Sequence, residues 1–167
     1  MKGVTIRQVM PMDRAAIRRV EELAFGRTDE AELVDALVAA GDDALELVAQ
    51  RDSAVIGHLL FSTLLVESGN RSFSGVALGP LAVLPEARRS GIGAALVDDA
   101  HRRLRLAGET LSVVLGDPDY YGRFGYSHER AEKFDSDYQS DALQALAWSG
   151  DAPSTGRLVY PAAFSAL

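Results

Sequence analysis

The chain contains no cysteine. This absence excludes disulfides, thiol nucleophiles and sulfur-ligated metal sites together. Histidine is scarce as well: His58, His101 and His128 are widely separated and form neither an HxH nor an HExxH motif. Because metal sites in proteins rely on closely spaced ligands of these types, the sequence predicts chemistry without a metal ion.

Basic residues and long apolar runs are also in short supply. The chain has 17 Lys and Arg against 24 Asp and Glu, a net charge of −7. Nucleic-acid binding normally needs a basic face, so we expect no nucleic-acid partner, and a cationic or amine-bearing partner fits the charge better. No apolar run approaches the ~20 residues of a membrane span, and the first ten residues lack the apolar segment of a signal peptide. We therefore expect a cytoplasmic protein without a membrane partner.

The composition is that of an ordinary globular protein. Of the 167 residues, 47% are hydrophobic and 25% are charged, and there are no repeats or low-complexity tracts. This length suits one domain with a substantial core and is short for two. We therefore expect a single domain over residues 1–167.

Hydrophobic periodicity and turn residues predict alternating helices and strands. The expected elements are a strand at 3–9, helices at 13–25 and 29–40, strands at 44–52, 54–66 and 73–84, a helix at 91–107, a strand at 110–116 and a short helix from residue 117. Residues 110–116 are apolar throughout, as in a strand buried on both faces. Together with the helix and strand before it, this strand predicts a right-handed β-α-β unit with parallel strands. Near the C-terminus, residues 141–148 predict a helix and 157–160 a closing strand.

The segment LPEARRSGIGAALV, residues 84–97, joins a predicted strand to a predicted helix. A P-loop would end in GK[ST], which is absent here, and a dinucleotide fingerprint would need a third glycine. The segment instead has an arginine, two residues and then G-x-G, over Arg88 to Gly93. A helix N-terminus presents unpaired amides and partial positive charge to a pyrophosphate, and glycine lets the backbone approach closely. The open alternative is a flexible helix entry with solvated arginines.

A second irregularity lies in the preceding strand. Gly79 and Pro80 interrupt a run that otherwise predicts an interior strand, and proline cannot donate to the ladder. A bulge or break here would let two parallel strands separate and leave main-chain groups free to bind an extended, amide-rich ligand. An edge strand with a harmless proline is the alternative.

The segments GPLAVLPEARRSGIGAALV, TLSVVLG and YYGRFGY together resemble the GNAT superfamily of N-acetyltransferases. They are most similar to a bacterial subgroup of predicted acetyltransferases with an LGDPxYYxRFGF segment. The resemblance implies an α/β (mixed α+β sheet) fold, the acyl-CoA N-acyltransferase fold, with the order βααββββαβαβ along the chain and splayed central parallel strands. It covers residues 3–126 and leaves 127–167 as a C-terminal segment.

The resemblance also implies site residues. Acetyl-CoA would be the co-substrate, with no metal, and the main-chain amides of Leu81 and Val83 would bond its acetyl and pantetheine groups. Tyr121 would be the general acid, because it stands four residues before a Gly-aromatic pair, whereas Tyr120 is one residue out of place. Plain aromatic packing is the alternative for both tyrosines. The pyrophosphate would lie on Arg88, Arg89, Ser90, Gly91, Ile92, Gly93 and Ala94.

Two positions depart from the family pattern. Val114 stands where many members have an asparagine, and Ala77 stands where several have a glutamate as general base. The base is therefore open. The candidates, each with an equally ordinary structural role, are Asp117, Glu22, Glu32, Asp35 and His58. Tyr138 and Trp148 are candidates for an acceptor pocket or for core filling.

The function predicted on these grounds is transfer of an acetyl group from acetyl-CoA to an amine of unknown identity by direct attack. The alternative from another class is a non-catalytic acyl-CoA-binding module, a sensor or assembly partner on the same fold. The acceptor can be a small molecule or a protein amine. A homodimer is compatible with the sequence, which does not determine the oligomeric state.

Overall fold

The computed structural model describes residues 2–166. One mixed sheet runs in the order β1-β2-β3-β4-β5-β7, and β8 pairs with β3 and β6. The strands are β1 (Val4–Gln8), β2 (Asp43–Arg51), β3 (Ala54–Ser68), β4 (Arg71–Val83), β5 (Leu111–Leu115), β6 (Phe134–Asp135), β7 (Leu143–Ala147) and β8 (Gly156–Val159). The α-helices are α1 (Arg14–Phe25), α2 (Asp29–Ala39), α3 (Ile92–Leu106), α4 (Pro118–Tyr121) and α5 (His128–Ala131), and a 3-10 helix, η4, spans Ala162–Ala166.

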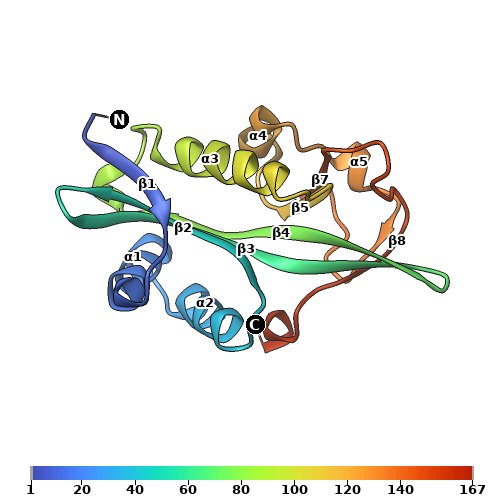
Figure 1. Cartoon of the computed structure of the whole chain (residues 1–167), viewed down its shortest axis with the longest axis horizontal. Coiled ribbons are helices and arrows are strands. Elements are labelled where there is room, and N and C mark those ends of the chain that lie inside the picture. Colours follow the sequence, from blue (N-terminus) through green and yellow to red (C-terminus); the bar gives the residue numbers. More distant parts are fainter. Residues whose placement is uncertain (1, 167) are drawn as a thin grey trace.

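Helices cover both faces of the sheet. In Figure 1, α1 and α2 lie on one face and α3 and α4 on the other, and η4 brings the C-terminal end beside α2. Each long helix buries one apolar stripe: Ile17 and Val20 on α1, Leu37 on α2, Ile92 and Leu96 on α3. These stripes follow the three- and four-residue spacing that a helix facing a core requires. In the part of the chain that the structure describes, no helix is long and apolar enough to cross a membrane.

Most of the predicted elements are confirmed, with two corrections. Residues 143–147 form strand β7 rather than a helix, because they pair with the outer edge of β5 from Leu111 to Leu115. An unpaired edge on a buried strand would leave main-chain groups unsatisfied, and pairing overrides the helical propensity of the segment. The order implied by the family resemblance has one strand too many: only β2, β3 and β4 lie between α2 and α3, as the hydrophobic pattern of residues 44–84 predicts.

The predicted break at Gly79 and Pro80 is confirmed as a β-bulge. Leu59 on β3 faces Leu81 while Phe61 faces Leu78, so β4 carries one extra residue between these pairs. On its other side β4 runs parallel to β5 only from Val76 to Leu78. Since β4 continues to Val83 and β5 ends at Leu115, the two strands part beyond the bulge and one edge of β4 is left without a strand partner.

Candidate functional site

The open edge of β4 carries two main-chain amides in a defined direction. The amide of Leu84 donates to the Ile56 carbonyl on β3 at 2.9 Å. Main-chain groups along a strand point alternately to its two sides, so the amides of Val83 and Leu81 point away from β3. They therefore face the space where β5 has ended, as an extended ligand would need.

The loop after β4 turns directly into α3. Gly91 precedes the helix with φ +84°, and Arg89 has φ +63°, so two of three consecutive residues are left-handed. The Ser90 hydroxyl donates to the Ala87 carbonyl at 2.5 Å, which ties the loop to itself. The first residues of α3, whose amides have no acceptor within the helix, line the same cavity as Leu81 and Val83 on the open edge of β4.

A cavity of about 330 Å³ lies between this loop and the open strand edge, and we call it the loop cavity. Of the residues predicted to bind the cofactor, all but Ser90 line it. One guanidinium nitrogen of Arg88 donates to the Ala24 carbonyl at the end of α1, at 2.6 Å. Arg88 thus also joins the loop to α1. The lining residues are Ala24, Phe25, Leu81, Ala82, Val83, Ala87, Arg88, Arg89, Gly91, Ile92, Gly93, Ala94, Tyr120 and Arg123.

Tyr120 and Arg123 belong to this cavity and were not among the residues predicted to bind the cofactor. The Arg123 guanidinium lies over the Tyr120 ring at 4.7 Å from the centroid. The Tyr120 hydroxyl lies 2.7 Å from where a Cβ on Gly93 would stand. The three-residue spacing of Tyr120 and Arg123 on one helical turn is the signal that could have linked them.

The absence of a side chain at Gly93 therefore leaves room for the Tyr120 hydroxyl in the lining of the loop cavity. In a Gly93→Val variant, the new side chain must displace Tyr120 and fill the cavity. A ligand that must make room for the added methyl groups should lose a free energy of binding comparable to that of an overpacked core, about 1–3 kcal/mol, which corresponds to roughly 5- to 150-fold weaker binding. Calorimetric titration with acetyl-CoA measures the loss. A Gly150→Val variant is the control, because nothing lies within 4 Å of a Cβ at that position, and equal affinity of both variants would show that the loop cavity holds no cofactor.

A second cavity, of about 450 Å³, adjoins the first where β4 and β5 part. We call it the aromatic cavity. Phe25 and Leu81 line both cavities, so the two are neighbours, and we call them together the cleft. Its lining residues are Phe25, Glu30, Leu33, Ala77, Leu78, Gly79, Pro80, Leu81, Val113, Val114, Leu115, Tyr121, Tyr138, Tyr160 and Phe164.

Tyr121 lies in this second cavity, at the point where the strands separate. Its ring packs on the backbone of Gly116, where a Cβ would come within 2.6 Å of the ring. The ring also meets Tyr120 edge-to-face at 5.0 Å and Tyr126 at 6.0 Å. Burial raises the pKa of Tyr121 to about 12. The phenol is thus fixed in position and protonated at neutral pH.

None of the predicted general-base candidates lines the aromatic cavity. Asp117 caps α4 by accepting from the Asp119 amide at 2.9 Å, while Glu22 and Asp35 both pair with Arg18. Glu30, which is not among the residues predicted from the sequence, is the carboxylate that does line it. Tyr138 lines it as well, whereas Trp148 packs against His101 with ring centroids 5.2 Å apart.

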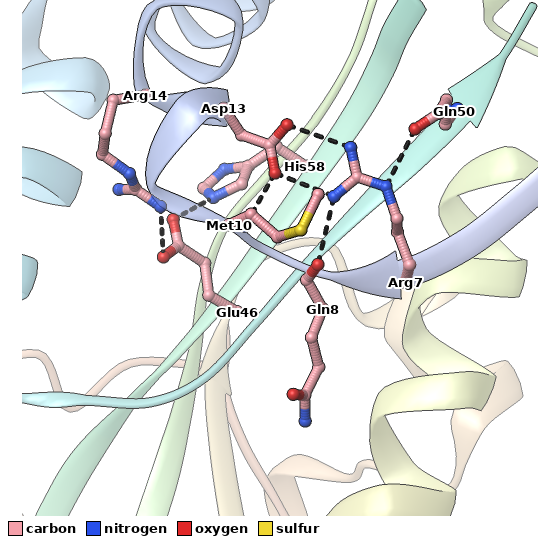
Figure 2. A network of polar contacts seen from close by, with 8 residues as sticks. All are labelled: Arg7, Gln8, Met10, Asp13, Arg14, Glu46, Gln50 and His58. Carbon is pink, nitrogen blue, oxygen red and sulfur yellow. Dashed lines mark hydrogen bonds and ion pairs between the residues drawn. The ribbon is translucent and has the colours of Figure 1, made fainter. Parts of the chain in front are cut away.

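His58 instead forms the middle of a buried charge network. Its Nδ1 lies 2.6 Å from a Glu21 oxygen and its Nε2 lies 2.6 Å from a Glu46 oxygen. Arg14 donates to the other Glu46 oxygen at 2.6 Å, as Figure 2 shows beside the neighbouring Arg7–Asp13 pair. An imidazolium can donate from both nitrogens, and two cations then balance two carboxylates.

The pKa values of His58 and Glu46 agree with that arrangement. Burial alone would lower the pKa of His58, but its hydrogen bonds to Glu21 and Glu46 outweigh burial and raise it. Burial would likewise raise the pKa of Glu46, but hydrogen bonds from His58 and Arg14 lower it. Glu21, the more deeply buried carboxyl, has a raised pKa because of that burial. None of the four residues lines the cleft, so the network supports the fold beneath it.

The cleft has no grouping suited to a metal ion. Among residues 2–166, no three His, Asp or Glu side chains are gathered as metal ligands would be. The groups available for chemistry are therefore main-chain amides, guanidinium groups, phenols and one carboxylate.

Comparison with known proteins agrees with this geometry. The profile of the family described as "Acetyltransferase (GNAT) domain" matches residues 5–128. The uncharacterized N-acetyltransferase YjhQ of Escherichia coli K12 is 37% identical over 116 residues, which cover 68% of this chain and 64% of YjhQ, a little under two thirds of that protein. The uncharacterized N-acetyltransferase YhbS of the same strain is 36% identical over 122 residues, which cover 72% of each chain.

Two solved structures extend the similarity to nearly the whole chain. A GNAT family acetyltransferase from Brucella melitensis, in complex with acetyl-CoA, is 38% identical with a TM-score of 0.82, and covers 96% of this chain and 97% of its own. Escherichia coli YhbS, in complex with CoA, has a TM-score of 0.89 at 30% identity, and covers 97% of this chain and 92% of its own. The parted strands, the glycine loop at the start of α3 and these relatives lead to one conclusion: the chain belongs to the GNAT family of acetyltransferases.

Proposed function

We propose that the protein catalyses transfer of an acetyl group from acetyl-CoA to an amine within this cleft. The observation that carries this proposal is the open edge of β4, where the amides of Leu81 and Val83 face the space left by β5. The amide-rich pantetheine arm would pair with this edge as a short strand. The pyrophosphate would then lie at Gly91–Ala94, where the first amides of α3 are unpaired.

The thioester end would reach the junction of the two cavities, at Leu81 and Tyr121. The ammonium of the acceptor first loses a proton to water; the neutral amine then attacks the thioester carbonyl carbon, a C–N bond forms, and collapse of the tetrahedral intermediate breaks the C–S bond. The departing thiolate takes the Tyr121 proton, and a proton released from nitrogen returns, by way of water, to the phenolate. A phenol whose pKa is raised by burial keeps this proton until the thiolate forms.

Acetyl-CoA is expected to stabilise the protein against heat, whereas NAD and ATP are not. The loop lacks the third glycine of the motif that binds NAD and the lysine of the P-loop that binds ATP. At a ligand concentration one hundred times the dissociation constant, the gain is about 2.7 kcal/mol. Differential scanning fluorimetry measures the shift. An unchanged melting temperature at millimolar acetyl-CoA would contradict the proposal that this protein binds acetyl-CoA.

Catalysis is tested separately from binding. If the chain were a non-catalytic acyl-CoA-binding module, acetyl-CoA would still stabilise it, but a panel of amines would release no CoA thiol above the uncatalysed rate. Mass detection of the acetylated amine in the same reactions distinguishes transfer from simple hydrolysis of the thioester.

A further inference from the structure

The walls of the aromatic cavity come from distant parts of the chain. Tyr138, Tyr160 and Phe164 form a row of edge-to-face rings, with centroids 5.2 Å and 5.6 Å apart. The Tyr138 hydroxyl donates to the Phe164 carbonyl at 3.4 Å, which fastens η4 over the cavity. Phe25 and Leu33 line it from α1 and α2. The walls are thus largely aromatic and apolar.

The strand side of the cavity is apolar too. Ala77 and Val114, the positions at which the family resemblance would place a glutamate and an asparagine, both line it. No lysine, arginine or histidine lines the cavity within the described chain. A carboxylate or phosphate on a ligand would therefore meet no positive partner there, and its desolvation would be costly.

One ionised group remains, and it is negative. Glu30 accepts from the Arg27 guanidinium through both oxygens, at 2.9 Å and 2.5 Å. Its side chain is 15% exposed, while that of Arg27 is 60% exposed. The hydrogen bond from Arg27 lowers the pKa of Glu30, so the carboxylate stays charged at neutral pH. Arg27 itself lies outside the cavity lining, so Glu30 is the ionised side chain that borders the cavity.

We propose that the acceptor is a monoamine on an aromatic or bulky apolar body, with its ammonium drawn in by Glu30 and its body held against Tyr138, Tyr160 and Phe164. Rings of this kind favour both apolar contact and a nearby cation. Polyamines, aminoglycosides and free amino acids fit poorly, because they carry further charges that the walls cannot pair. This inference rests on the proposed function, in which the aromatic cavity is the acceptor side.

The test measures binding apart from turnover. The protein is saturated with CoA and titrated calorimetrically with 2-phenylethylamine, with putrescine, which replaces the ring by a second ammonium, and with phenylalanine, which adds a carboxylate. We expect 2-phenylethylamine to bind at least tenfold more tightly than either. Equal or weaker binding of 2-phenylethylamine, or no binding at all, overturns the inference.

Two variants locate the binding. Glu30→Gln and Phe164→Ala should each weaken the binding of 2-phenylethylamine at least tenfold and leave the affinity for acetyl-CoA unchanged. Glu22→Gln is the matched control, since Glu22 pairs with Arg18 at 2.9 Å but does not line the cavity. If Glu22→Gln weakens the binding of 2-phenylethylamine as much as Glu30→Gln does, then the overall negative charge of the protein, rather than the cavity, is responsible. The inference then fails.

The outcomes for binding and for turnover are separable. Tight, Glu30-dependent binding of 2-phenylethylamine without acetylation would support this acceptor site and contradict the proposed function. Preferred acetylation of putrescine over 2-phenylethylamine would support the function and contradict the acceptor class.

Discussion

Replacing Tyr121 with phenylalanine is expected to lower kcat by about 10²- to 10⁴-fold, the usual contribution of a general acid. The ring still packs on Gly116 and Tyr126, so only the proton donor is lost. Acetyl-CoA affinity should be nearly unchanged, because a group that acts when the thiolate leaves contributes to the transition state rather than to ground-state binding. Steady-state kinetics with a saturating amine, together with calorimetric titration, measures both quantities.

The neighbouring Tyr120→Phe variant is the control. The Tyr120 hydroxyl lies beside Gly93 in the loop cavity, so its removal should alter cofactor affinity more than kcat. A wild-type kcat in Tyr121→Phe, or a large loss of kcat confined to Tyr120→Phe, would transfer the role of acid to Tyr120 or to water.

A His58→Leu variant is expected to lose about 3–5 kcal/mol of stability at pH 7, because breaking a buried ion pair leaves charge uncompensated. Glu21 and Glu46 would then share a closed space without the imidazolium between them. The loss of stability relative to the wild type should be smaller at pH 5, because protonation of Glu21 and Glu46 can remove their negative charge. Urea unfolding at both pH values measures it. The control is His128→Leu, since the His128 ring bonds a single carbonyl, that of Leu143.

The wild-type protein should show the matching pH dependence. The pKa of His58 is raised above its ordinary value of 6.5, so the imidazolium contributes its full stability below that value. This contribution is lost as the pH rises through the folded-state pKa. Melting temperatures from pH 6.5 to 9 should therefore decline more steeply in the wild type than in His58→Leu, and parallel curves would mean that the ring is neutral when folded.

The local parts of the site could be predicted from the sequence. The spacing from Arg88 to Gly93 correctly predicted a loop that opens a helix, and Gly79-Pro80 correctly predicted a bulge with parting strands. Both depend on backbone constraints that glycine and proline impose within a few residues. The roles of Tyr121 and of the cofactor-binding residues stay predictions, although their positions in the cleft fit them.

Of the aromatic cavity, the sequence predicted Tyr138 as a candidate lining residue, but the full lining could not be predicted in the same way. Glu30 and Phe164 meet across one cavity although more than a hundred residues separate them in the chain. No periodicity connects such positions, because only the packing of η4 beside α2 brings them together. The prediction of a helix at residues 141–148 was wrong for a related reason. These residues pair with β5, and the unpaired edge of β5 cannot be recognised from the segment itself.

The alternation of amides along β4 has a consequence for how this cleft can diverge. Under the proposed function, the main-chain contacts of Leu81 and Val83 survive any substitution that keeps the strand and still fits beside Gly93, so the side chains at these positions can vary. An insertion or deletion between them is different, because it would turn their amides to opposite edges of the strand. Relatives that bind the same cofactor can therefore differ in the residues here but should share the same number of residues from the bulge to Leu84.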